Sequence, residues 1–222
     1  MLSEYSQMLR GVLAALAIAA ASTSASAMGF RLVPFDTGSC GSQCLQIIEG
    51  TGEIEPNSAE RFAAFVGQNL GQSRISTALV LHSPGGHVGG ALRLGFILRE
   101  LRATTIVGRV GGNATTIVDG VCASACVYLF MGGSRRYVPQ GSVLGVHAMA
   151  DVPSPRDIVG GGSIGARVSQ EKAADALREY ARLMGVNPAV VALGQATPHT
   201  SLRVLTPAEI ARFKLGSQKL PR

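Results

Sequence analysis

The sequence predicts a single α/β domain. Short apolar runs bounded by turn residues alternate with longer segments whose apolar residues recur at helical spacing, which is the pattern of repeated β-β-α or β-α units. A chain of 222 residues accommodates one domain with a sizeable core and argues against a second independent domain.

The first half of the chain is expected to supply three strands and two helices. Residues 29–42 are typical of a loop, because they contain Pro34 and a cluster of Gly and Ser. A helix over 58–66 begins at an N-cap of Asn57 or Ser58. The remaining expected elements are strands over 45–48, 77–81 and 104–107 and a helix over 88–101.

In the second half, a glycine-rich loop with residues 116–119 precedes strands over 136–138 and 143–146, and a long helix follows over 170–184. Residues 159–165 read Val-Gly-Gly-Gly-Ser-Ile-Gly, which is too rich in glycine to hold rigid structure by itself. This segment predicts a mobile flap beside His147.

Residues 1–27 are typical of a secretory signal peptide. Arg10 makes its start positive, residues 11–21 are apolar or small, and Ala25-Ser26-Ala27 forms an A-x-A-like cleavage site. The apolar run is shorter than the ~20 residues that span a bilayer, and no cysteine follows it directly as in a lipoprotein. We expect a mature domain over 28–222 that is periplasmic or secreted, without a stable membrane anchor; an uncleaved amphipathic helix is the weaker alternative.

The charge and the aromatic content argue against a nucleic-acid partner. The net charge of +6 is spread along the chain, and aromatic residues make up only 5%, too few for a stacking platform. A well-solvated surface accounts for a basic balance of this size.

Four cysteines form two Cys-x-x-x-Cys pairs, Cys40/Cys44 and Cys122/Cys126. Export to an oxidising compartment favours disulfides. If residues 122–126 are helical, the second pair has Cα atoms about 6 Å apart, within disulfide range, and Ser124 faces the opposite side. A zinc site built from all four cysteines and buried free thiols at Cys122 and Cys126 are the alternatives.

Three segments carry the groups that an acyl-transfer site requires. Ser124 lies in Gly120-Val-Cys-Ala-Ser-Ala-Cys126, His147 ends Leu144-Gly-Val-His147, and an apolar run enters the turn Leu81-His-Ser-Pro-Gly-Gly86. A serine is a weak nucleophile until a base removes its proton, and imidazole can do so near neutral pH. Glycines let backbone N–H groups approach a developing oxyanion. The segments therefore predict a nucleophile, a base and half of an oxyanion hole.

In order and residue types these segments resemble the Clp-protease/crotonase superfamily, in particular the proteolytic subunit of Clp protease and its secreted bacterial relatives. In that family a strand runs into Ser-Pro-Gly-Gly and a helix, small residues surround the nucleophile, and the base ends a later strand. The tail, Leu205-Thr-Pro-Ala-Glu209 with Lys214-Leu-Gly216, also resembles the family's closing segment. The resemblance covers roughly residues 45–215. It implies a Clp/crotonase-type spiral of repeated β-β-α units that forms a homo-oligomer through its last helices.

By the same resemblance, Ser124 is the nucleophile, His147 is the general base, and the backbone N–H groups of Gly86 and Ala125 form the oxyanion hole. The implied function is that of an exported serine hydrolase, best described as a peptidase without cofactor or metal ion. Its peptide or protein substrate would lie as an added strand along the Gly85-Gly86 edge. Acyl-CoA chemistry of the crotonase type is disfavoured, because an exported enzyme rarely meets coenzyme A.

One family residue is missing. The orienting aspartate of the family falls here on Leu202, and the neighbouring residues 199–201 carry no carboxylate either. A non-catalytic peptide-binding module is therefore an alternative. A second alternative is a Ser/Lys peptidase, because signal-peptide peptidases of the superfamily use a lysine on a later helix, and Lys172 is one of three lysines. His147 remains the stronger candidate base, since Leu-Gly-Val-His matches the family's strand end.

Two more histidines, His82 and His87, flank the Gly-Gly turn. They are expected to be polar groups at an exposed turn. A zinc site made by these two, His147 and Asp151 is an alternative that nothing in their spacing requires.

We predict that the exported protein begins at Met28, because signal peptidase cleaves after an A-x-A site that follows a short apolar run. Intact-mass measurement of the protein recovered from the periplasm checks this. A full-length mass in the soluble exported fraction would contradict it.

Overall fold

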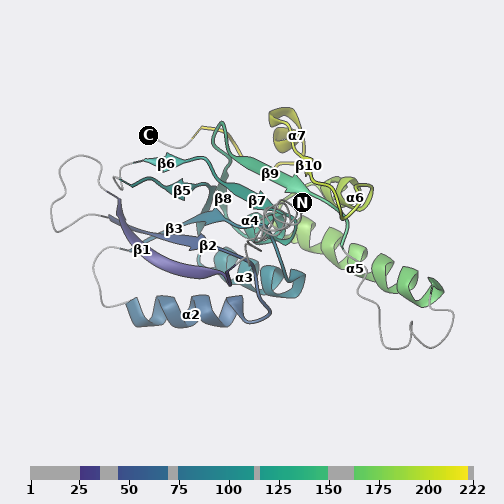
Figure 1. Cartoon of the computed structure of the whole chain (residues 1–222), viewed down its shortest axis with the longest axis horizontal. Helices are drawn as coiled ribbons and strands as arrows, with labels where there is room; N and C mark the ends of the chain where they lie inside the picture. The colour runs from purple at the N-terminus through teal and green to yellow at the C-terminus, as the bar shows by residue number, and fades with distance from the viewer. Residues whose placement is uncertain (1–25, 36–44, 70–74, 113–115, 150–162, 220–222) are drawn as a thin grey trace, which may run out of the picture.

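The computed structural model describes residues 26–35, 45–69, 75–112, 116–149 and 163–219 and confirms an α/β architecture (Figure 1). The main sheet has the strand order β1-β2-β3-β4-β8, a second sheet has the order β10-β9-β7, and β5 pairs with β6. The strands of the main sheet are β1 (Gly29–Phe35), β2 (Leu45–Thr51), β3 (Ile75–His82), β4 (Thr104–Val107) and β8 (Arg135–Tyr137). The others are β5 (Arg109–Val110), β6 (Ile117–Val118), β7 (Val121–Ala123), β9 (Val143–Val146) and β10 (Arg203–Val204).

The two larger sheets are joined where β3 ends. Strands β2, β3, β4 and β8 are parallel, and β7 and β9 are also parallel to each other. Beyond β3, Ser83 bridges to Cys122 of β7, with Ser83 N–H donating to Val121 O at 2.7 Å. The carboxyl ends of β3, β7 and β9 therefore open toward one region, which is where parallel sheets commonly hold functional groups.

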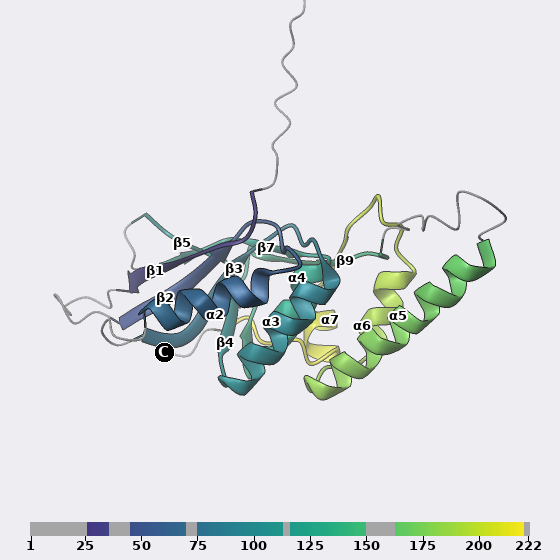
Figure 2. The same cartoon turned by 90° about the horizontal axis from the view of Figure 1, so that it is seen from below.

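The helices α2 (Ser58–Asn69) and α3 (Val88–Glu100) cover one face of the main sheet (Figure 2). Their apolar side chains pack with those of β2 and β3 into the main core, which includes Phe62, Leu79 and Leu94. On the other face, Val80 and Ile106 belong to a smaller cluster that the β5–β6 hairpin covers through Val110. Apolar residues on both faces explain why the strand signal in this part of the sequence is nearly continuous.

Helix α4 (Ala125–Met131) runs through the centre of the molecule, and all seven of its residues are buried. Its carboxyl end approaches α3 very closely, because Gly132 follows it and Gly95 lies opposite. A Cβ atom on Gly132 would lie 2.3 Å from Gly95 O and 2.5 Å from Gly95 Cα. Only a residue without a side chain permits this helix spacing.

The last part of the chain contributes α5 (Ser163–Leu183), α6 (Ala189–Gln195) and α7 (Pro207–Arg212). Arg99 and Arg136 tie α5 to α4, since both donate to Met131 O and to Met184 O at 2.9–3.2 Å. These carbonyls lie at the carboxyl ends of the two helices, where orphaned acceptors and the helix dipole favour a cation.

Three expectations from the sequence need correction. Residues 29–35 form β1 and not a loop; Pro34 is compatible with this because β1 is an edge strand, where a missing N–H donor is tolerated. Residues 163–165 of the flap expected over 159–165 belong to α5, which begins at Ser163; residues 150–162 lie outside the described residues. The short elements β5, β6, β10, α6 and α7 were not expected, since two-residue strands and one- to two-turn helices leave little periodicity to detect.

Within the residues that the structure describes, no helix combines the length and the apolar character needed to cross a membrane.

We predict that Gly132→Ala destabilises the mature protein by about 1–3 kcal/mol, because its methyl group would push α3 and α4 apart. Gly67→Ala is the matched control: it lies on the exposed side of α2 with nothing within 4 Å of a Cβ atom, so alanine should be neutral or stabilising by up to about 1 kcal/mol. Urea unfolding of both variants measures the difference. Equal stability of Gly132→Ala and wild type would show that the helices do not pack as described.

Candidate functional site

Ser124 occupies a strained turn between β7 and α4. Its φ of 55° and ψ of −124° lie in a region that residues with a side chain rarely adopt. The backbone is held on both sides: Ser124 N–H donates to Gly145 O at 2.9 Å, and Val127 N–H donates to Ser124 O at 3.0 Å. The side chain is half-buried and makes no capping hydrogen bond to α4. A sharp strand-to-helix turn of this kind presents a serine hydroxyl for nucleophilic attack.

His147 follows the strand next to that of Ser124. Ala123 of β7 pairs with Gly145 of β9 in parallel register, so both candidate residues leave the carboxyl edge of the same two-strand ladder. Neighbouring strands are about 4.8 Å apart, so the two residues lie at adjacent strand ends.

The imidazole of His147 is oriented by a backbone group. His147 Nδ1 lies 2.7 Å from Ala148 O. A carbonyl oxygen can only accept, so Nδ1 carries the hydrogen in this contact, and in the neutral imidazole Nε2 then keeps its lone pair. A neutral imidazole with a free Nε2 is the form that can take a proton from a hydroxyl.

The Gly85-Gly86 turn lies directly against Ser124. Gly85 has a φ of 109°, and a Cβ atom there would lie 2.8 Å from Ser124 Cβ and 3.1 Å from Ala125 N. Any side chain at this position would therefore both strain the backbone and collide with the turn that carries the candidate nucleophile.

Within the described residues, Gly86 keeps an unpaired backbone edge on the side away from Ile54. Ile54 N–H donates to Gly85 O, and His87 N–H donates to Ile54 O, each at 2.7 Å, which makes a parallel bridge between Ile54 and Gly86. In such a bridge the N–H and C=O of Gly86 itself point away from Ile54. The N–H of Ala125, the first residue of α4, has no acceptor within its helix. Both backbone donors expected for an oxyanion hole are thus unpaired in the described part of the chain, and Gly85 sets the Gly-Gly turn against Ser124.

The sequence predicts a Cys122–Cys126 disulfide, and the structure contains it. The two Cα atoms are 5.2 Å apart, and both residues are fully buried. The geometry differs from the expected helical one, because Cys122 belongs to strand β7 and only Cys126 to helix α4. The bridge therefore closes the strand-to-helix turn around Ser124. Cys40 and Cys44 lie outside the described residues.

His82 and His87 have structural partners. His82 Nδ1 accepts from Val121 N–H and His87 Nδ1 accepts from Gly90 N–H, each at 3.0 Å, so His82 supports β7 and His87 caps α3. Burial and then the positive charge of Arg109 lower the pKa of His82, partly opposed by Glu49. In both rings Nδ1 is a hydrogen-bond acceptor, so in both the ring hydrogen is on Nε2. In the described part of the chain no three His, Cys, Asp or Glu side chains gather as metal ligands, and Asp151 lies outside it.

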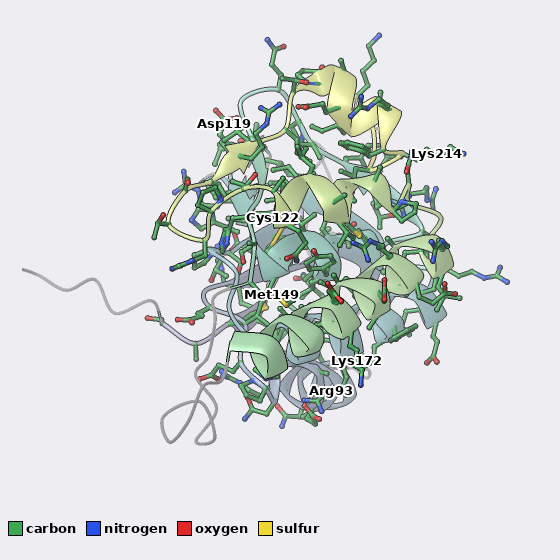
Figure 3. All side chains as sticks on the ribbon, turned by 90° about the vertical axis from the view of Figure 1, so that its right-hand side faces the viewer. Arg93, Asp119, Cys122, Met149, Lys172 and Lys214 are labelled. Carbon is green, nitrogen blue, oxygen red and sulfur yellow. A yellow bond between two sulfur atoms is a disulfide. The ribbon has the colours of Figure 1, made fainter. Side chains whose placement is uncertain are left out.

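Lys172 is not brought to Ser124. It is exposed on α5, and at 100° per residue it lies roughly 180–200° around the helix from the buried residues Ala174 and Ala181. Figure 3 shows Lys172 on the outer side of α5, away from the labelled Cys122 beside the turn.

Leu202 stands next to His147, where the family resemblance expects an aspartate. Strand β10 pairs antiparallel with β9, with Arg203 opposite Val146, so the register continued by one residue sets Leu202 opposite His147. The leucine side chain covers Gly145, since a Cβ atom on that glycine would lie 2.7 Å from Leu202 Cγ. Leu202 thus lies opposite His147 in the β9–β10 register, and its side chain supplies no carboxylate there.

Sequence reasoning missed three contributors to this site: Ala148, Gly145 and Ile54. Each acts through its backbone, whose hydrogen bonds no residue type encodes. Only Gly145 could have been noticed in the sequence, because a glycine inside a strand often marks a place where another segment approaches the backbone closely. Here that segment is Leu202.

No protein-family model and no curated protein matches this chain. Among solved structures, it resembles a lysine-to-alanine mutant of the 1510-N membrane-bound stomatin-specific protease in complex with a substrate peptide, with 14% identity and a TM-score of 0.50 over 78% of this chain and 74% of that one. A serine-to-alanine mutant of the same protease gives 13% identity and a TM-score of 0.47 over 78% of each chain. A ClpP1 mutant from Listeria monocytogenes has 14% sequence identity and a TM-score of 0.47, over 74% of this chain and 84% of that one. The likeness confirms the predicted Clp/crotonase-type fold.

We predict that replacing both Cys122 and Cys126 with alanine lowers the free energy of unfolding by roughly 2 kcal/mol, the loop-closure entropy of so short a loop. Urea unfolding measures the loss, and peptide mapping without reduction should find the two cysteines linked within one peptide of the wild type. Complete alkylation of both thiols before reduction would contradict the bridge.

Proposed function

We propose that the chain is an exported serine peptidase in which Ser124 is the nucleophile and His147 the general base. The observation that carries the proposal is the strained turn of Ser124 beside the carboxyl end of β9, where His147 presents a free Nε2. Backbone strain persists where the surrounding structure enforces it, and functional sites are where it concentrates.

The chemistry follows from these positions. His147 Nε2 takes the proton of Ser124 Oγ as the oxygen attacks the carbonyl carbon of the scissile peptide bond. The N–H groups of Gly86 and Ala125 stabilise the charge that develops on the carbonyl oxygen. The protonated imidazole then gives its proton to the leaving amine, and water hydrolyses the acyl-serine by the same steps.

A peptide is the substrate class that the open edge fits best. The free N–H and C=O of Gly86 can pair with an extended peptide backbone as an added strand. The structurally similar stomatin-specific protease was solved with a substrate peptide, which supports the same class here. The signal-like leader and the buried disulfide both support an exported, oxidising location. Assembly into a homo-oligomer remains part of the proposal through the family resemblance.

The second candidate function is a peptide-binding module without turnover. Leu202 favours it, because the residue opposite His147 cannot orient or charge-stabilise the imidazole as a carboxylate does. A Ser/Lys mechanism is less well supported, since Lys172 is exposed on the far side of α5.

We predict that the mature wild type reacts covalently with a fluorophosphonate probe and that Ser124→Ala does not. His147→Ala should lose most of the labelling rate, because general-base help contributes roughly 10²–10⁴-fold. Lys172→Ala and the exposed-serine control Ser201→Ala should label as wild type does. Gel fluorescence with the folded proteins measures all five rates.

Two results would overturn the proposal in different ways. Labelling that depends on Lys172 and not on His147 would assign the protein to the Ser/Lys mechanism. No labelling of correctly folded and assembled protein would favour the binding module.

A further inference from the structure

We infer that the backbone carbonyl of Ala148 is the positioning group of this site and replaces the carboxylate that would otherwise orient His147. The 2.7 Å contact between His147 Nδ1 and Ala148 O fixes which ring nitrogen carries the hydrogen. The inference rests on the proposed function, because it concerns how the base of that reaction is oriented.

The Ala148 peptide group is itself held in place. Ala148 N–H donates to Thr197 O at 2.8 Å, and Thr197 is anchored on α6 by hydrogen bonds from its N–H to Gly194 O and from its hydroxyl to Leu193 O, each 3.0 Å. Helix α6 also approaches His147 directly, since a Cβ atom on Gly194 would lie 3.5 Å from His147 O. The carboxyl end of α6 therefore holds the Ala148 peptide group, and the carbonyl of Ala148 orients the imidazole of His147.

No carboxylate competes for this role in the part of the chain that the structure describes around His147. Leu202 is opposite the histidine, and α6 carries no charged side chain. The nearest charged residue on β10, Arg203, is paired with Glu209 at 2.7 Å, and Glu209 in turn accepts from Thr206 N–H. Since His147 Nδ1–H donates to the Ala148 carbonyl, Nε2 is the ring nitrogen left to act as the base.

A carbonyl and a carboxylate differ in charge more than in geometry. Both hold the Nδ1–H tautomer, but only the carboxylate stabilises the imidazolium that forms when the serine is deprotonated. The site should therefore have an oriented base without that charge stabilisation, and a carboxylate placed opposite His147 should supply it.

The tautomer can be measured without any turnover. In ¹⁵N-histidine spectra of the mature Ser124→Ala protein above the titration range of its histidines, His147 should show hydrogen on Nδ1. His82 and His87 serve as internal controls, because their Nδ1 atoms accept hydrogen bonds and their hydrogen should be on Nε2. His147→Ala assigns the signal. A His147 signal with hydrogen on Nε2 would overturn the inference.

The second measurement adds the missing charge. Leu202→Asp should raise the plateau rate of fluorophosphonate labelling roughly tenfold, the effect of about one pKa unit of added basicity, and should move the acid limb of its pH profile to higher pH. Two controls accompany this variant: Leu202→Asn has the same shape without the charge, and Val204→Asp places the charge two residues further along the same face of β10. Both should keep the wild-type labelling rate and its pH profile.

The outcomes separate this inference from the proposed function. An unchanged rate and profile for Leu202→Asp in folded protein would overturn the inference while labelling of Ser124 still supports the function. Hydrogen on Nδ1 of His147 without labelling in any variant would support the positioning role and reject the peptidase.

Discussion

The conformation of Ser124 is the constraint on which the rest of the site depends. A non-glycine residue adopts a φ of 55° with a ψ of −124° only when its surroundings enforce it. Here the enforcing contacts are the hydrogen bond to Gly145 O, the Cys122–Cys126 bridge across the turn, and the backbone of Gly85 pressed against it. The same contacts bring β3, β7 and β9 together, so the contacts that hold the Ser124 turn also assemble the candidate site.

The burial of α4 explains how the fold bears this strain. All residues of α4 are buried, its start is tied by the disulfide, and its end is held by Arg99 and Arg136 on Met131 O. Burial and then the neighbouring charge of Arg99 lower the pKa of Arg136 to about 10, which leaves Arg136 cationic at neutral pH; burial also lowers the pKa of Arg99. Arg99 and Arg136 donate to carbonyl oxygens at helix ends, where positive charge is favourable. These contacts offset part of the free-energy cost of partly burying two cations side by side.

The candidate residues of the site were easier to identify from the sequence than the backbone groups that support them. Ser124, His147 and the Gly-Gly turn carry recognisable residue types, and the structure sets them at neighbouring strand ends. The disulfide was expected from its spacing, but the strand-to-helix geometry was not, because a positive φ at Ser124 leaves no mark on the sequence. Strand β1 was misread through Pro34, whose edge position depends on tertiary pairing. The Ala148 carbonyl could not be predicted, since any residue supplies one.

The most direct test of the central claim is a crystal structure of the mature protein after reaction with a phosphonate inhibitor. The account predicts a covalent bond from phosphorus to Ser124 Oγ and a phosphonyl oxygen within hydrogen-bond distance, about 2.7–3.1 Å, of both Gly86 N and Ala125 N. His147 Nε2 should face Ser124 Oγ, with Nδ1 still bonded to Ala148 O. An adduct on another residue, or a phosphonyl oxygen turned away from both backbone donors, would contradict it.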